Sequence, residues 1–162
     1  MAKSKTLAEF GRFKEIIHAA LYKSENIREV LLGDISKLNK SEIMSGFKKR
    51  VKSHLFIDDT VTDTDTYIYY DVDAPNVYTH IKDCRVIMYV ITHRDTLENY
   101  SKEGYSGNRI DILCEMIEDV LLNNDDILKD FGIGDLNLTN IGIYNATRFY
   151  GRILTFEVPS FR

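Results

Sequence analysis

The sequence predicts an α+β fold in a single domain, 1–162, built on a mostly antiparallel sheet of about five strands. Apolar residues recur at helical spacing through the first 50 residues, and from residue 51 onward they follow the patterns of strands. One further helix, at about 109–122, separates the early strands from the late ones. Strands that follow one another, with helices set apart, are typical of antiparallel α+β folds. We therefore expect an N-terminal helical segment, 1–50, packed against a sheet-bearing body, 51–162.

Three helices are predicted in the N-terminal segment. The first begins at Thr6 and carries apolar residues on one face at every third or fourth position. The second begins near Asn26 and ends at Gly33, because glycine readily adopts the conformations that end helices. The third begins near Ser41 and ends in the basic run 48–50, where positive charge favours the C-terminus of a helix.

The body is predicted to contribute all the strands. The first two are joined by a polar hairpin connection rich in aspartate. The third is apolar on both faces, as is typical of a central strand, and we expect a helix on one face and another subunit on the other. The fourth contains a bulge near Asn140, because its apolar residues change parity there. The predicted strands are 51–57, 66–70, 85–92, 136–143 and 152–158.

The helix at about 109–122 is predicted to be a main element of the core. Its apolar residues form one stripe and its acidic residues lie mostly away from that stripe. Each buried Ile or Leu on the stripe should stabilise the fold by about 1.5–3 kcal/mol. Asn108 is the predicted N-cap, with Asp111 three residues further on, and Cys114 is expected in the core.

Composition predicts a soluble domain of the cytosolic type. No apolar run approaches the roughly 20 residues that a membrane span requires. The two cysteines, Cys84 and Cys114, lie far apart and predict neither a disulfide framework nor a metal-ligand pair. The basic start of the chain leads into an amphipathic stretch that contains Glu9, so we expect no secretory signal.

The net charge of −4 divides unevenly along the chain. Residues 1–54 carry 12 Lys+Arg and 6 Asp+Glu, a balance of +6, whereas residues 55–162 carry 9 and 19, a balance of −10. Six aspartates lie between Asp58 and Asp73, where no Lys or Arg occurs. Such asymmetry indicates nucleic-acid affinity, an interface between unlike surfaces, or simply solvated helices and loops.

No pattern with catalytic or cofactor-binding spacing is found. His93-Arg94-Asp95 matches the start of a protein-kinase catalytic loop, but the Asn that should follow five residues later is missing. Gly132-Ile-Gly134 lacks the third glycine of a dinucleotide site, and the four His have no zinc-ligand spacing. The aspartates between 58 and 73 have oxygen ligands for Ca²⁺ or Mg²⁺ but not the EF-hand register, so solvated positions are favoured. We expect no enzyme, no cofactor and no bound metal.

Tyrosine is the most unusual part of the composition, with ten copies and no Trp. Most of these residues lie in the predicted strands and their connections, and tyrosine is favoured both in strands and at protein interfaces. Stacking of bases on the sheet would require a lining of Lys and Arg, which the acidic body lacks. A protein interface is therefore favoured, and no sequence-specific binding of nucleic acid is expected.

Three segments in the second half of the chain carry a family resemblance. They are Arg109-Ile-Asp111 with Met116, Ile117 and Leu121, then Gly132-Ile-Gly134 with Leu136 and Leu138, and finally Tyr150-Gly-Arg152 with Leu154, Phe156 and Val158. This succession, over roughly residues 25–158, resembles the tail terminator (tail completion) proteins of tailed bacteriophages and phage-tail-like particles. The resemblance implies an α+β subunit that forms a homo-oligomeric, hexameric ring on the tail tube. Such a ring stops polymerisation of tube or sheath and offers a surface to the neck of the head.

The resemblance also implies a location in the virion tail, after assembly in the cytoplasm of the bacterial host. Its partners would be further copies of the chain, the tail tube protein, and sheath and neck proteins, without a membrane. Long loops without structure of their own are often functional, so two connections are the candidate contact loops, although exposure alone would also explain them. The candidate interface residues are Asp58, Asp59, Asp63 and Asp65 in the first loop, and Arg94, Tyr100 and Tyr105 in the second.

Two other functional classes remain open. The first is an adaptor or inhibitor module that binds a single protein through the Tyr-rich sheet. The second is a metal-dependent enzyme that uses the aspartates between 58 and 73.

Overall fold

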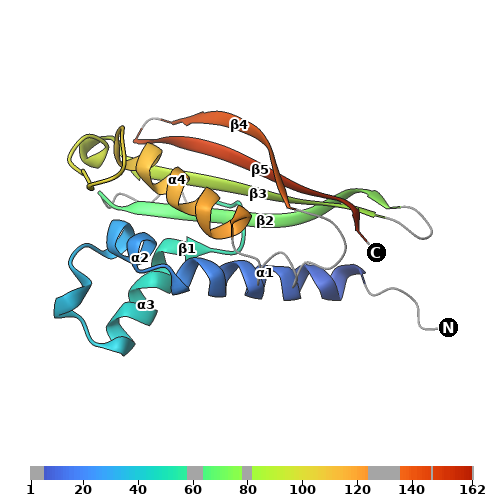
Figure 1. The fold of residues 1–162 in the computed structure, drawn as a ribbon, viewed down its shortest axis with the longest axis horizontal. Helices are drawn as coiled ribbons and strands as arrows, with labels where there is room; N and C mark the ends of the chain where they lie inside the picture. Colours follow the sequence, from blue (N-terminus) through green and yellow to red (C-terminus); the bar gives the residue numbers. More distant parts are fainter. Residues whose placement is uncertain (1–5, 58–63, 78–81, 124–135, 147, 162) are drawn as a thin grey trace.

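The computed structural model describes residues 6–57, 64–77, 82–123, 136–146 and 148–161, and it confirms the predicted α+β class (Figure 1). Its helices are α1 Thr6–Lys23, α2 Glu25–Leu32, α3 Lys40–Arg50 and α4 Arg109–Leu122, with short 3₁₀ helices η1 Ile35–Lys37 and η2 Arg94–Thr96. Its strands are β1 Val51–Lys52, β2 Thr66–Val77, β3 Lys82–His93, β4 Asn137–Asn145 and β5 Phe149–Phe161. These strands form one sheet in the order β1-β2-β3-β5-β4.

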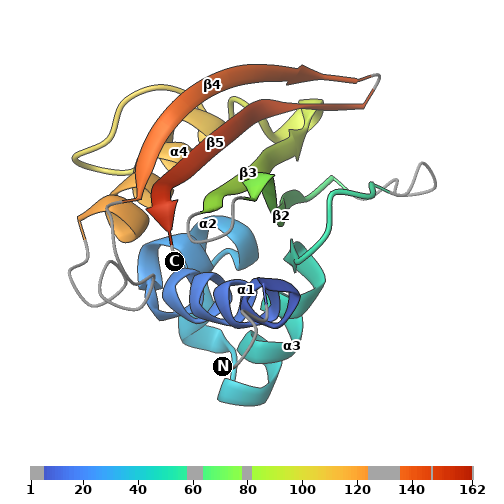
Figure 2. The same cartoon turned by 90° about the vertical axis from the view of Figure 1, so that its right-hand side faces the viewer.

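The helices cover one face of the sheet, which we call the helical face. Figure 1 shows α1 running beside the sheet and α4 crossing in front of it, and Figure 2 shows the sheet curving over the helices. The cross-strand pairs Ile68–Val90 and Met88–Leu154 point to this face and are buried. The packing of the N-terminal helices and α4 against the sheet is therefore confirmed, and this layer forms the main core.

The predicted helix starts are corrected in two cases. The N-cap of α2 is Ser24, whose Oγ accepts a hydrogen bond from the Ile27 amide at 3.2 Å, and not Asn26. The N-cap of α3 is Asn39, which forms a capping box with Glu42, and not Ser41. Each of these helices has two candidate N-cap residues two positions apart, and the sequence alone does not decide which of the two is the N-cap. The predicted stop of α2 at Gly33, where φ is +80°, and the N-cap of α4 at Asn108 are confirmed.

The first strand differs most from its prediction. The structure forms only Val51–Lys52 as β1 in place of the predicted strand 51–57. This strand pairs with β2 in parallel, with Val51 opposite Ile68. The prediction that a hairpin joins the two strands is therefore wrong. Parallel neighbours need a longer return path than a hairpin turn provides. Residues 58–63 of that connection lie outside the described residues.

Strand β2 is longer than predicted and continues through Pro75 to Val77. Its pairing with β3 shifts register between Asp73 and Asn76, and this irregularity accommodates a proline that has no amide to donate. A second shift, between Leu138 and Asn140, confirms the bulge predicted near Asn140.

The opposite face of the sheet, which we call the outer face, is apolar at one end and charged at the other. Tyr67, Tyr69, Ile91 and Phe149 are buried there, and half-buried residues that include Leu55 and Ile57 pack against them. The two faces of the central strand β3 are thus apolar, as predicted. Leu55 and Ile57 of the same chain thus cover part of the outer face. That a second subunit covers the rest of this face stays a prediction.

Candidate functional site

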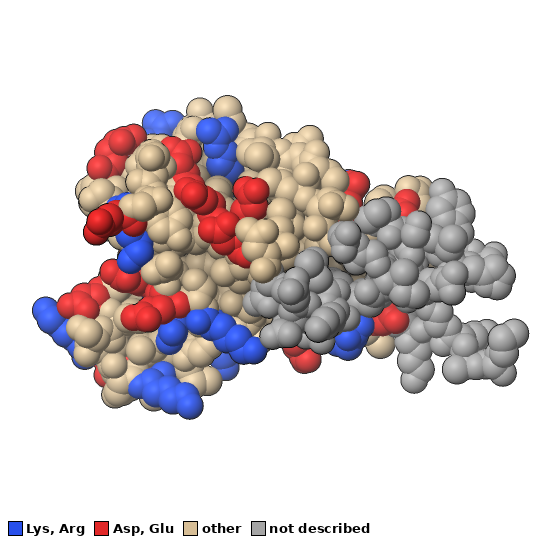
Figure 3. Space-filling model, in the orientation of Figure 1, with Lys and Arg blue, Asp and Glu red and all other residues tan. Residues whose placement is uncertain are grey.

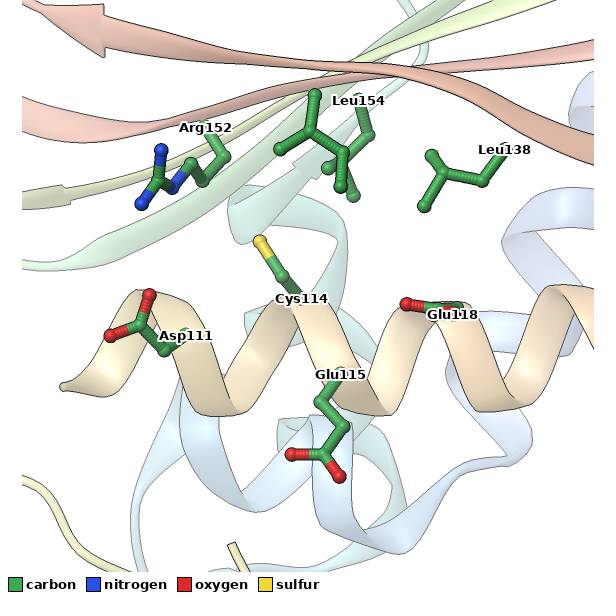
Figure 4. Close-up of a pocket in the computed structure, with 8 residues that line it drawn as sticks. Asp111, Cys114, Glu115, Glu118, Leu138, Arg152 and Leu154 are labelled. Atoms are coloured by element: carbon green, nitrogen blue, oxygen red, sulfur yellow. The ribbon is translucent and has the colours of Figure 1, made fainter. Parts of the chain in front are cut away.

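A groove of about 340 Å³ opens on the helical face, between α4 and the strands β4 and β5, and we call it the acidic groove. In Figure 4 the side chains of Arg152, Leu154 and Leu138 extend from the sheet toward α4. Cys114 points up from the helix toward them, whereas Glu115 points away from the sheet. The residues that line the groove are Asp111, Cys114, Glu115, Glu118, Leu138, Ile141, Arg152 and Leu154.

The groove exists because α4 covers only part of the helical face. Ile110, Leu113 and Ile117 of α4 are fully buried. The neighbouring stripe of the helix, with Cys114, faces β4 and β5 across the groove. Ile141 and Ile143 of β4 point to the same side of the sheet but remain 59% and 62% exposed. An edge strand with exposed apolar side chains is typical of a contact surface.

The acidic groove is lined mainly by acidic side chains around the thiol of Cys114, which stays protonated at neutral pH. Three carboxylates, Asp111, Glu115 and Glu118, line it together with one guanidinium, that of Arg152. The pKa of Cys114 is raised to about 12, mainly by burial; the charge of Arg152 lowers it, and the carboxylates of Asp111 and Glu118 raise it. A thiol that stays protonated is a poor nucleophile, so the groove offers a binding surface and no activated cysteine.

We expect both cysteines to resist alkylation in the native protein. At pH 8, with a pKa of about 12, Cys114 would react roughly a thousandfold more slowly than a free thiol, because only the thiolate attacks. Cys84 is 2% exposed and therefore inaccessible. Iodoacetamide labelling followed by mass spectrometry should give no label in the native state and two labels in urea. Fast native labelling of Cys114 would contradict the assigned environment.

A second groove, of about 740 Å³, lies on α3 and β1, and we call it the basic groove. It contains lysines and no acidic residue, and Met44 within it is 42% exposed. Burial and the charge of Lys48 both lower the pKa of the nearby His18. Figure 3 shows acidic side chains gathered over α4 and the upper part of the molecule, and basic ones over the lower helices. The lining residues are Lys40, Ser41, Met44, Ser45, Lys48, Lys49 and Lys52.

The first predicted contact loop is described only at its end. Asp58, Asp59 and Asp63 lie outside the described residues, and Asp65 forms an ion pair with Arg50. The two remaining aspartates of the acidic stretch are also paired, Asp71 with Lys14 and Asp73 with Arg85. No group of three or more His, Cys, Asp or Glu suited to a metal ion occurs within the described ranges.

The second predicted contact loop, 94–107, is held close to the helices. Arg94 is exposed and donates a hydrogen bond to Asn145 Oδ1 at 3.0 Å. Tyr100 and Tyr105 are half-buried and pack against the main core. The ring of Tyr100 lies under the Arg109 guanidinium, 4.8 Å from its central carbon. Asp65, the described end of the first loop, lies beside the start of the second, where its backbone carbonyl accepts a hydrogen bond from the His93 amide at 3.2 Å. The interface role of the residues in both loops stays a prediction.

The exposed isoleucines of β4 are the feature that pattern analysis missed. The parity of Ile141 and Ile143 predicts the bulge near Asn140 but not whether their side chains are covered. Their exposure follows from two facts: β4 is at the edge of the sheet, and α4, although it contacts β4, leaves these two side chains uncovered. No helix in the described part of the chain has the length and hydropathy of a membrane span.

Comparison with protein families gives a match over most of the chain. The model of the YomW family matches residues 14–158, which include both grooves and the whole sheet as far as Val158. No curated protein and no solved structure matches the chain significantly.

Proposed function

Because the chain belongs to the YomW family, a family of Bacillus phage-region proteins, and is thus phage-associated, we propose that it is a structural protein of a phage tail. In this proposal it is a terminator that forms a ring on the end of the tail tube, stops its polymerisation and provides the attachment surface for the head or neck. The role is not enzymatic, its location is the virion tail, and its partners are further copies of itself and the tube protein.

One observation carries the proposal: the chain has two unlike grooves on separate elements. A ring subunit contacts its two neighbours through different surfaces, because a head-to-tail contact joins one patch to another. The acidic groove on α4 and the basic groove on α3 are two such patches. The exposed isoleucines of the edge strand β4 add apolar area beside the first.

The alternative is an adaptor or inhibitor that binds one protein through the tyrosines of the outer face. The observation that favours it is a pair of half-buried rings, Tyr89 and Tyr144, whose centroids are 5.6 Å apart on that face. An adaptor of this kind would need no ring.

Light scattering and electron microscopy distinguish the two functions. The terminator should form a ring of uniform mass, either alone or on tube subunits, and tubes polymerised in its presence should stop lengthening. A protein that stays monomeric at the highest soluble concentration and leaves tube length unchanged would contradict the proposal. A Tyr89→Ser substitution should leave ring assembly intact if the outer face is not the contact.

A further inference from the structure

We propose that the acidic groove of one copy binds the basic groove of a second copy of this chain. The inference rests on the proposed function, since it identifies the two surfaces through which neighbouring subunits of the ring would meet. It commits to a second copy because both halves of the contact are present in one chain and complement each other in charge and apolar character.

The charges of the two grooves are opposite. Four lysines line the basic groove, and three acidic residues and Arg152 line the acidic groove. Of the acidic residues, Glu115 extends away from the sheet and Asp111 also accepts a hydrogen bond from the Asn108 amide. Complementary potentials across an interface steer association and exclude wrong partners. Helix α3 ends in Lys48-Lys49-Arg50, so its last turn concentrates positive charge at one end of the basic groove.

Apolar side chains also line each groove. Met44 lies among the lysines of the basic groove, and its flexible side chain can adapt to an irregular partner. Ile141 lies in the acidic groove with Leu138 and Leu154. Contact between these apolar side chains beside the paired charges would combine the two kinds of contact usual in an interface.

The charges of the grooves are not neutralised within one chain. In the part of the chain that the structure describes, neither Lys48 and Lys49 nor Glu115 and Glu118 form an ion pair, and all four are exposed. Helix α2 contacts both α3 and α4 and lies between these two helices (Figures 1 and 2). The grooves therefore meet only between copies, in a head-to-tail contact that closes into a ring or continues as a filament.

Two charge-reversed variants test the pairing. One carries K48E and K49E in the basic groove, and the other carries E115K and E118K in the acidic groove. Each alone would set like charges against each other, so we expect self-association to weaken at least about tenfold in sedimentation equilibrium. An equimolar mixture of the two should assemble as the wild type does, because each reversed groove then meets its opposite. The matched control, K23E with K37E, reverses two exposed lysines outside the basic groove and should assemble normally.

The outcomes separate this inference from the proposed function. If the wild type assembles and both reversed variants assemble equally well, the pairing is overturned while the ring stands. If the reversed variants assemble normally but no longer stop tube growth, the grooves bind the tube protein and the pairing is again overturned. A wild type that neither assembles nor stops tubes overturns both. Thermal melts of each variant check that it is folded, and recovery in the mixture would support the pairing directly.

Discussion

Replacing Gly151 by alanine is expected to destabilise the protein by about 3 kcal/mol or more, and to abolish soluble expression if the wild type is marginally stable. Gly151 lies in β5 opposite Ile91 of the central strand and is buried. A Cβ atom built there would lie 2.8 Å from Ile91 Cα and nearer still to the Val90 carbonyl oxygen. Both of these atoms belong to the backbone, so relief requires β3 and β5 to separate.

Gly142 supplies the matched control for this substitution. It lies in β4, the strand next to β5, and points to the same outer face of the sheet. A Cβ atom there would meet only Ile153, at the ordinary contact distance of 3.6 Å. Gly142→Ala should therefore change the free energy of unfolding by less than about 1 kcal/mol. Urea unfolding of the two variants measures the difference, and equal stabilities would show that the strands do not approach each other as described.

The close approach at Gly151 illustrates what a sequence does and does not predict. Periodicity predicts α4 at 109–122 and the central strand 85–92, because each has a long and regular apolar pattern. Periodicity does not predict how closely two strands pack, because a glycine in a strand is equally consistent with a bulge, a bend or a close contact.

Topology is the part of the fold that local patterns leave open. Residues 51–57 are predicted to form a seven-residue strand, but only Val51 and Lys52 pair with β2. The segment after them leaves the sheet because Leu55 and Ile57 pack on the outer face. Whether two neighbouring strands run parallel depends on where the connection returns, and neither strand encodes that path.

The candidate site was predictable in its charge but not in its location. Dividing the sequence at residue 54 separates a balance of +6 from one of −10, and the two grooves carry those signs. The contacts predicted in the two loops stay a prediction, and the grooves that we propose as contacts lie elsewhere, on α3 and beside α4. The reason is that exposure of Ile141 on an edge strand depends on how far a helix reaches across the sheet, which is a tertiary property.

Arg109 is one of the side chains that connect loop 94–107 to the helices. The Arg109 guanidinium donates hydrogen bonds to the Thr96 carbonyl at 3.1 Å and to Asn99 Oδ1 at 3.1 Å, both in the loop. It also donates to the Val30 carbonyl at 3.0 Å, which is among the last carbonyls of α2. The last turn of α2 contains no basic residue of its own, so Arg109 supplies the positive charge that favours its C-terminus.

Replacing Arg109 by alanine should therefore destabilise the protein by about 2–3 kcal/mol. The substitution removes three hydrogen bonds from a charged donor and leaves two backbone carbonyls without this partner. It also removes the contact with the Tyr100 ring. Urea unfolding measures the loss, and amide hydrogen exchange should rise in 97–107 more than in the sheet.

Two further variants show whether the geometry or the charge of Arg109 is responsible for its contribution to stability. Arg109→Lys keeps the positive charge but lacks the planar fork that reaches three acceptors at once, so it should recover less than half of the lost stability. Arg94→Ala removes an exposed arginine with a single side-chain contact, to Asn145, and should change stability by less than about 0.5 kcal/mol. A ring defect in Arg94→Ala would then reflect a direct contact, whereas a defect in Arg109→Ala would reflect release of the loop. Equal stability of Arg109→Ala and the wild type would mean that the loop is held by Lys102 and Glu29, 3.3 Å apart, rather than by Arg109.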